Sequence, residues 1–206
     1  MRAAELDAVV LDAYGTLMTL NDPTPSLVDV LAQYGLERPA EVVRAGVEAE
    51  IAYYTPRASE GRDEESLAHL QRECARVFLE TVEGKLDPGD FAPIFAGALR
   101  FEALPGVKSS LERLRALGVT LAVVGNWDLT LRERLAEVGL ERYFDCVIHA
   151  AGKPAPDGLQ RALAELSVDP QRALYIGDTD DDERAARAAG MHFAPAPVTA
   201  AVDQLG

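Results

Sequence analysis

An aspartate, a glycine and a hydroxyl residue follow an apolar run near the start of this chain. Asp12 comes directly after Ala8–Leu11, and Gly15 and Thr16 follow at once. Glycine permits a sharp turn, and α/β proteins bind ligands where the carboxyl ends of their strands open. A carboxylate placed there can act as a nucleophile and form a covalent intermediate that water then hydrolyses. Two residues after this aspartate the chain carries Tyr14.

Other polar residues follow later apolar segments. Asn126 follows the second such segment, Lys153 lies shortly after the third, and Asp178 and Asp182 follow the fourth. Because the carboxyl ends of parallel strands meet at one edge of a sheet, we expect these residues to gather around Asp12. Each has a simpler explanation when taken alone, since asparagine and aspartate begin helices and a loop lysine is usually solvated.

Gathered carboxylates have an electrostatic consequence. Two unit charges about 4 Å apart repel by roughly 4 kcal/mol at an effective dielectric constant near 20. Asp12, Asp178 and Asp182, once together, would therefore take up protons or bind a cation. Oxygen-only ligands favour a hard ion such as Mg²⁺. Such an ion, together with Lys153, would offset the charge of a small anionic substrate, and phosphoryl transfer needs mainly positioning and charge neutralisation.

Composition limits the partners. The 206 residues carry a net charge of −14, which disfavours binding to nucleic acid or to an anionic membrane. Lysine occurs only as Lys85, Lys108 and Lys153, so the last of these stands out. The N-terminal residues are too acidic for a signal peptide and no apolar stretch is long enough to span a membrane, so we expect a cytoplasmic protein. The oligomeric state is not indicated.

Short apolar segments bounded by turn residues predict buried strands. They are Ala8–Leu11, Val119–Val124, Cys146–Ile148, Ala173–Ile176 and Met191–Ala194. Amphipathic helices are expected between the later strands, over Leu129–Val138, Leu159–Leu166 and Glu183–Ala189, with another opened by a capping box of Ser109 and Glu112. Alternating strands and helices predict an α/β fold, a doubly wound parallel sheet with a Rossmann-like core.

About a hundred residues without a strand signal separate the first predicted strand from the second. Helices are expected within them at Leu27–Tyr34, Pro39–Tyr54, Glu64–Val82 and Phe91–Leu99. We therefore predict a catalytic core of residues 1–17 and 101–206 and an inserted helical cap domain of residues 18–100. The insertion could instead be a structural element or a dimer surface.

Competing catalytic motifs are not convincing. Gly152 and Lys153 are followed by proline without the glycine spacing of a phosphate-binding loop, and the serines lack a nucleophile-elbow setting. The three histidines show no ligand-like spacing, so structural roles are expected for them.

The motifs together resemble the haloacid dehalogenase superfamily. Four segments resemble its four motifs in the same order, namely Asp12–Leu17, Leu121–Asn126, Gly152–Pro156 and Gly177–Met191. The resemblance implies an aspartate nucleophile, a Rossmann-like core and a helical cap after the first motif.

The resemblance also implies individual roles. Asp12 would be the nucleophile, and Thr16 and Asn126 would help to hold it or the substrate. Lys153 would neutralise charge between Asp12 and the substrate anion. Mg²⁺ would bind Asp178, Asp12 and the backbone carbonyl of Tyr14, and Asp182 would support Lys153 or the waters of the metal.

Two departures separate the possible activities. Phosphatases of the superfamily carry an aspartate acid where this chain has Tyr14, whereas its 2-haloacid dehalogenases carry tyrosine there. The second motif has Gly125 in place of serine or threonine. The retained Asp178 favours a Mg²⁺-dependent phosphatase of a small phosphorylated metabolite. The alternatives are a metal-independent 2-haloacid dehalogenase and a weakly active or non-catalytic ligand-binding member.

Overall fold

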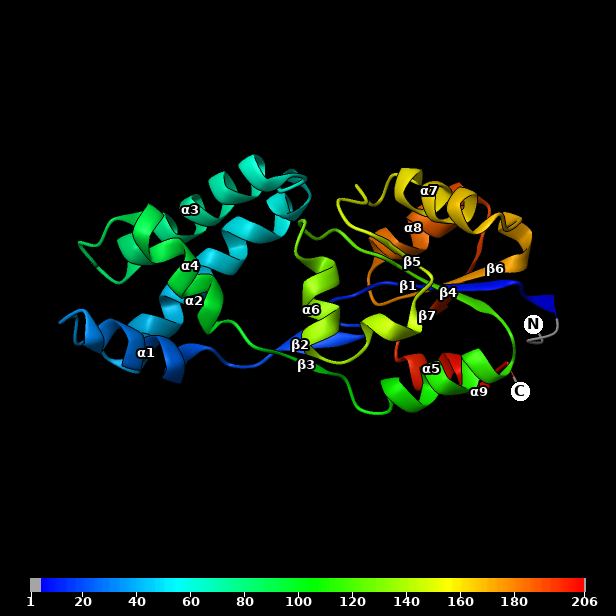
Figure 1. The fold of residues 1–206 in the computed structure, drawn as a ribbon, viewed down its shortest axis with the longest axis horizontal. Helices are drawn as coiled ribbons and strands as arrows, with labels where there is room; N and C mark the ends of the chain where they lie inside the picture. Colours follow the sequence, from blue (N-terminus) through cyan, green and yellow to red (C-terminus); the bar gives the residue numbers. More distant parts are fainter. Residues whose placement is uncertain (1–4, 206) are drawn as a thin grey trace. The chain divides into compact units, whose positions relative to one another are not determined.

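The chain folds into two compact units (Figure 1). The computed structural model describes residues 5–205. The first unit combines the chain up to Thr19 with the chain from Phe101 onward, and the second is Leu20–Arg100. The assignment of a catalytic core and a cap to these segments stays a prediction.

A five-stranded parallel sheet forms the centre of the first unit, in the order β5–β4–β1–β6–β7. The central strand β1 (Ala8–Leu11) lies between β4 (Thr120–Val124) and β6 (Ala173–Gly177). The outer strands are β5 (Cys146–Ile148) and β7 (His192–Pro195). Every residue of β1 is buried, as expected for a parallel strand covered on both faces. The predicted α/β fold is therefore confirmed.

Alternate side chains of β1 enter two separate apolar cores. Val9 and Leu11 pack in the core that also contains side chains of α5 (Val107–Ala116), α6 (Leu131–Glu137) and α9 (Val198–Asp203). A short helical turn, η3 (Glu141–Tyr143), contributes Tyr143 to the same core.

Ala8 and Val10 point to the opposite face of the sheet. They pack in a core with residues of α7 (Asp157–Leu166) and α8 (Asp180–Ala189). Figure 1 shows these two helices on one side of the sheet and α5 and α9 on the other. The turn η4 (Pro170–Arg172) precedes β6. The period-two alternation of a strand thus builds both layers of the doubly wound fold.

A small two-stranded sheet joins the segments at which the chain leaves and re-enters the first unit. It consists of β2 (Met18–Leu20) and β3 (Phe101–Ala103). The expectation of a stretch without strands was wrong here. Each strand has only three residues, too few to show the alternation on which a sequence-based prediction depends.

The second unit is helical. Its described helices are α1 (Thr24–Gln33), α2 (Ala40–Tyr54), η2 (Thr55–Glu60), α3 (Glu64–Thr81) and α4 (Pro88–Ala98). Their apolar faces share one core, in which the rings of Phe78 and Phe91 stack with centroids 5.9 Å apart. The predicted helices of this segment all occur, with ends that differ by a few residues.

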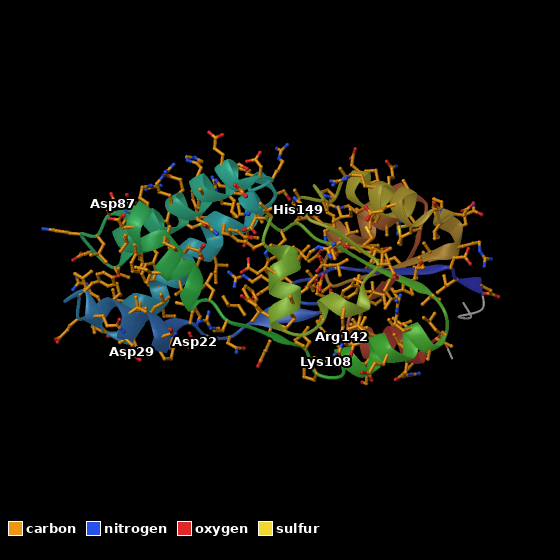
Figure 2. The ribbon with its side chains drawn as sticks, in the orientation of Figure 1. Asp22, Asp29, Asp87, Lys108, Arg142 and His149 are labelled. Carbon is orange, nitrogen blue, oxygen red and sulfur yellow. The ribbon has the colours of Figure 1, made fainter. Side chains whose placement is uncertain are left out.

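Charged side chains cover the outside of both units. Figure 2 labels Asp29 and Asp87 on the helical unit and Lys108 and Arg142 on the other, and all four are exposed. Within the described part of the chain, no helix combines the length and the apolar character that crossing a membrane requires.

Candidate functional site

The predicted nucleophile and the predicted lysine meet at the carboxyl end of the sheet. Asp12 follows β1, and its backbone N–H donates to the carbonyl of Ile176 on β6 at 2.9 Å. Its side chain is nearly buried, and Oδ1 accepts a hydrogen bond from Lys153 Nζ at 2.5 Å. Lys153 is itself 8% exposed, so this ion pair is largely removed from water.

Asn126 holds the backbone that carries the lysine. Its Nδ2 donates to the carbonyl of Lys153 at 3.0 Å, and its Oδ1 accepts from the Lys153 N–H at 2.9 Å. Both ends of the amide are thus used to fix this loop to the end of β4. The geometry shows a positioning contact for Asn126, and its predicted contact with substrate stays a prediction.

Asp182 accepts hydrogen bonds from two directions. Its Oδ1 binds Lys153 Nζ at 2.6 Å. Its Oδ2 accepts the N–H of Asp178 at 3.2 Å and the N–H and hydroxyl of Thr179 at 3.0 and 2.7 Å. The Thr179 hydroxyl also accepts the Asp182 N–H at 3.2 Å, which completes a capping box at the start of α8. The helix begins three residues before the predicted Glu183, so the acidic run both starts the helix and enters the site.

Asp178 stands at the open side of the group. It is exposed, and its Oδ1 accepts from the Thr16 hydroxyl at 3.3 Å. A Cβ on Gly15 would lie 2.3 Å from Asp178 Oδ2, and this glycine has φ +80°. Glycine is therefore required at this turn both by its backbone conformation and by the close approach of the carboxylate.

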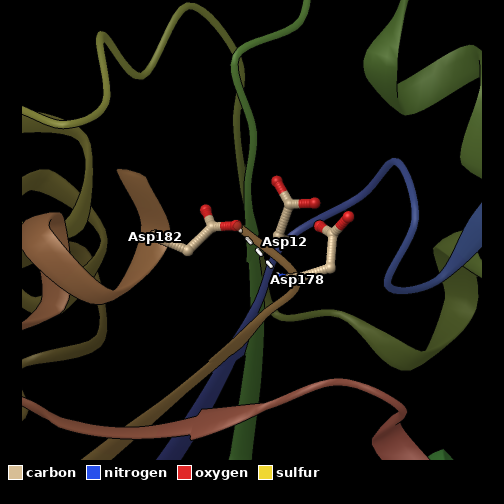
Figure 3. A group of neighbouring side chains, drawn as sticks. All are labelled: Asp12, Asp178 and Asp182. Atoms are coloured by element: carbon tan, nitrogen blue, oxygen red, sulfur yellow. Dashed lines mark hydrogen bonds between the residues drawn. The ribbon is translucent and has the colours of Figure 1, made fainter. Parts of the chain in front are cut away.

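Three carboxylates converge on one space. Asp12, Asp178 and Asp182 each offer an oxygen, and these oxygens lie within 4.8 Å of one another. Figure 3 shows the three carboxyl groups together, with the hydrogen bond from the Asp178 backbone to Asp182 dashed. Hard oxygen donors at this spacing fit a divalent cation. Asp12 and the exposed Asp178 suit direct contact, since Asp182 already binds Lys153 and the start of α8.

Burial and charge set the protonation of the group. Burial, with a smaller effect of the Asp182 charge, raises the pKa of Asp12 to about 6 even though Lys153 opposes the shift. Burial also raises the pKa of Asp178. Burial opposes ionisation of Asp182, but Lys153 and Thr179 outweigh it and lower its pKa. Three acidic groups around one ammonium leave an excess of negative charge that a cation would offset.

Burial alone would lower the pKa of the Lys153 ammonium, but the two carboxylates that it contacts raise it. The ammonium form is therefore the stable one. The site keeps one fixed positive charge beside the predicted nucleophile.

Tyr14 follows Asp12 by two residues and carries a phenol in place of a carboxylate. Its side chain is 51% exposed, and its ring lies 6.4 Å from that of Trp127, centroid to centroid. Trp127 in turn lies 5.2 Å from Phe101. The backbone carbonyl of Tyr14 was predicted to bind metal, and that role stays a prediction.

Tyr175 and Thr179 were not predicted as site residues. Tyr175 lies within the apolar segment of β6, where an aromatic residue is read as core, and Thr179 lies in an acidic run. The sequence feature that could have identified the tyrosine is its hydroxyl, which is the one polar side-chain group of that strand. Burial raises the pKa of this phenol well above its ordinary value, so the hydroxyl keeps its proton.

Comparison with known proteins gives the family. The model of the haloacid dehalogenase-like hydrolases matches residues 6–190, nearly the whole chain. The chain therefore belongs to the haloacid dehalogenase-like hydrolase family. The order of the strands and the carboxylates at their ends agree with this membership.

The relatives that are similar in sequence carry two different names. A haloacid dehalogenase-like hydrolase domain-containing protein 3 from Xenopus laevis is 37% identical over 48% of this chain and 42% of its own length. The chain thus spans less than half the length of that relative. A phosphoglycolate phosphatase from Nitrosospira multiformis is 31% identical over 91% of this chain and 81% of its own length.

A solved structure shows the same fold. The L-2-haloacid dehalogenase from Xanthobacter autotrophicus with covalently bound chloropropionic acid has a TM-score of 0.64 and 25% identity. The superposition covers 92% of this chain and 77% of the dehalogenase. The chain is thus similar in sequence to a protein named as a phosphatase and in fold to one named as a dehalogenase.

Proposed function

We propose that this hydrolase is a Mg²⁺-dependent phosphatase of a small phosphorylated metabolite, with Asp12 as its nucleophile. The observation that carries the proposal is the position of Asp178, whose carboxylate shares a 4.8 Å cluster with those of Asp12 and Asp182. A metal-independent reaction at Asp12 has no need of a second, exposed carboxylate at this place.

The residues of the chain divide the reaction between them. A carboxylate oxygen of Asp12 attacks phosphorus, the bond from phosphorus to the leaving-group oxygen breaks, and the leaving group departs with that electron pair. Water then releases phosphate from Asp12 and restores the carboxylate. Lys153, bonded to Asp12 at 2.5 Å, holds the nucleophile and offsets negative charge. A bound Mg²⁺ would supply further charge neutralisation for the phosphoryl group.

Tyr14 limits the leaving groups that the proposed phosphatase can expel. A carboxylic acid at this position would protonate the leaving group, a contribution typically worth about 10²–10⁴-fold in rate. The phenol of Tyr14 is half exposed and takes the place of that acid. We therefore expect acyl phosphates, and phosphate esters with good leaving groups, to react faster than simple alkyl phosphates.

The relatives support this proposal. The Nitrosospira multiformis phosphoglycolate phosphatase aligns with most of this chain, so 2-phosphoglycolate belongs among the substrates to test. We further propose that residues 18–100 act as a cap that selects the substrate, because this helical segment is inserted in the sequence between Asp12 and the second strand of the main sheet. The net charge of −14 supports an enzyme of small molecules rather than a nucleic-acid enzyme.

A 2-haloacid dehalogenase is the second candidate. Tyr14 and the similarity to the Xanthobacter autotrophicus enzyme favour it. A halide leaves without a proton, so the missing acid would carry no penalty. The third candidate, a weakly active ligand-binding member, is favoured by Gly125 and Tyr14 together.

The first test replaces the nucleophile. We expect Asp12→Asn to lower phosphate release from acetyl phosphate by about 10³-fold or more, because the amide cannot form the covalent intermediate. Asp203→Asn is the matched control, since this exposed aspartate contacts only Arg113 among the side-chain pairs described. Equal activity of Asp12→Asn and the wild type would remove the proposal, whereas loss in Asp12→Asn alone would exclude the non-catalytic candidate.

Metal removal separates the two enzymatic candidates. Phosphate release from acetyl phosphate and 2-phosphoglycolate is measured with Mg²⁺, after EDTA, and after Mg²⁺ is restored. We expect the activity to disappear with EDTA and to return with the metal. Halide release from 2-chloropropionate in EDTA, without phosphate release under any condition, would establish the dehalogenase instead.

A further inference from the structure

Tyr175 is the largest polar side chain that is fully buried in the described chain, with a relative exposure of 0%. It lies on β6 beside the central strand and pairs with Val10 in register. Its ring packs in the core beneath α7 and α8, while its hydroxyl extends to the carboxyl end of the sheet.

The hydroxyl joins three separate parts of the site. Its oxygen lies 2.9 Å from Lys153 Nζ, 3.0 Å from Asp182 Oδ1 and 3.0 Å from the backbone carbonyl of Val124. The lysine can only donate, so the phenol accepts from it. The single phenolic hydrogen then points to the aspartate or to the carbonyl on β4, both of which accept.

This contact completes the surroundings of the lysine. An ammonium group has three N–H donors. Lys153 directs them to Asp12, Asp182 and Tyr175, at 2.5, 2.6 and 2.9 Å. Without the phenol, one N–H of a nearly buried ammonium would lose its acceptor, and the group could rotate or shift away from the two carboxylates.

We propose that Tyr175 is a positioning residue of the hydrolase, which fixes the Lys153 ammonium between Asp12 and Asp182 by giving its third N–H an acceptor that the buried ring holds in place. This inference rests on the proposed function of Asp12 and Lys153. The tyrosine does not touch substrate; it acts through the lysine. A purely apolar role for Tyr175 would leave the lysine unaffected by removal of the hydroxyl.

Tyr175→Phe tests the inference, because it removes one oxygen and keeps the ring that packs in the core. Tyr143→Phe is the matched control. Tyr143 is also buried in the first unit, and its hydroxyl donates to Glu112 Oε1 at 3.0 Å, outside the acidic cluster.

The kinetic readout compares the change in kcat with the change in KM for acetyl phosphate in the presence of Mg²⁺. A misplaced lysine affects the reacting geometry more than the capture of substrate, so we expect Tyr175→Phe to lower kcat about tenfold and to change KM by less than about threefold. Tyr143→Phe should change neither. Wild-type kcat in Tyr175→Phe would overturn the inference.

A spectroscopic readout follows the lysine itself. The chain has three lysines, and Lys85 and Lys108 are exposed, so ¹⁵N labelling of lysine side chains isolates the buried ammonium of Lys153 by its slow hydrogen exchange. We expect Tyr175→Phe to shift this resonance and to speed its exchange, and Tyr143→Phe to leave it in place. An unchanged Lys153 signal in Tyr175→Phe would contradict the inference.

The wild-type spectrum provides a test even if Tyr175→Phe does not fold. An ammonium with all three N–H groups bonded exchanges slowly, so a Lys153 signal that exchanges as fast as those of Lys85 and Lys108 would overturn the inference. The outcomes also separate the two proposals. Full activity of Asp12→Asn would refute the proposed function, whereas inactive Asp12→Asn with a fully active Tyr175→Phe would refute only the role of Tyr175.

Discussion

Gly125, which follows β4, and Gly177, which ends β6, lie close to the acidic group, and a side chain at each would meet different surroundings. A Cβ on Gly177 would lie 2.5 Å from Asp182 Cβ, so glycine is required there by close approach. A Cβ on Gly125 would find its nearest neighbours at 3.5 Å (Ala13 Cβ) and 3.7 Å (Leu131 Cδ2), which is ordinary contact. The backbone at Gly125 therefore has room for a serine or threonine side chain, and the structure does not require glycine there.

Gly125→Ser should consequently raise the catalytic efficiency of the enzyme. The new Cβ would lie 3.9 Å from Asp12 Oδ1, which places a hydroxyl donor beside the reacting group. A hydrogen bond to a charged group is worth about 1.5–3 kcal/mol, so we expect kcat/KM for acetyl phosphate to rise about tenfold. Gly125→Ala fills the same space without a donor and should stay near the wild-type rate. Equal rates for the two variants would show that the hydroxyl has no part in the reaction.

Residue types and positions were enough to predict most of the acidic group. Asp12, Lys153, Asp178 and Asp182 were each found by their place after an apolar segment, and the structure brings all four together. The rule that strand ends share one edge explains this success. Tyr175 was missed because a buried tyrosine and a buried phenylalanine produce the same strand pattern, and only the three-dimensional partners of the hydroxyl distinguish them.

At the scale of elements, the start of α8 links stability to the site. Thr179 caps the helix and also donates its hydroxyl to Asp182 Oδ2 at 2.7 Å. Thr179→Ala should therefore lower the free energy of unfolding by about 1 kcal/mol, the usual effect of losing an N-cap. It should also lower kcat roughly fivefold, because Asp182 loses one of the donors that hold it against Lys153. Denaturant unfolding and steady-state kinetics measure the two effects.

Ser66→Ala in α3 is the control for this prediction. Ser66 forms the capping box of that helix with Asp63, and its hydroxyl accepts the Asp63 N–H at 3.1 Å, the contact that Ser66→Ala removes. Its removal should destabilise the protein without a change in kcat. A similar loss of kcat in both variants would mean that Thr179 affects the rate only through general stability.

The same element shows where sequence patterns lose precision. The predicted start at Glu183 came from the first amphipathic residues, whereas the observed start is set by the hydrogen bonds of Thr179. In α5 a cap was predicted where none forms, and the predicted start is again too late. Its expected capping box of Ser109 and Glu112 is wrong: the helix begins at Val107, after Gly106, and the Ser109 hydroxyl donates to the Gly106 carbonyl at 2.9 Å. Many serines and aspartates could cap a helix, and tertiary packing decides which of them does.

At the scale of the whole molecule, burial on both faces fixes the place of β1 in the sheet. Every residue of β1 is buried, and the strand lies in the middle of the sheet between β4 and β6. Such patterns predict a doubly wound fold because they follow from the hydrophobic effect, which depends on residue type. The buried carboxyl of Glu50 in the helical unit was not predicted, because α2 also carries exposed glutamates such as Glu48 and the sequence spacing does not single one out.

Glu50 should make the stability of the helical unit depend on pH. Burial raises its pKa from 4.5 to about 7, against a smaller opposing effect of its hydrogen bond with Cys74. A raised pKa means that the folded unit holds the proton more tightly than the unfolded chain does. The stabilisation is therefore complete below pH 4.5 and is lost as the pH rises through about 7, with a total of about 3 kcal/mol.

Glu50→Gln removes this proton-linked contribution. Between about pH 5 and pH 8, the free energy of unfolding of Glu50→Gln should therefore fall less than that of the wild type. Denaturant unfolding at each pH measures the difference, and Glu48→Gln, an exposed change on the same helix, should keep the wild-type slope. Parallel pH dependences for Glu50→Gln and the wild type would show that Glu50 does not gain its proton on folding.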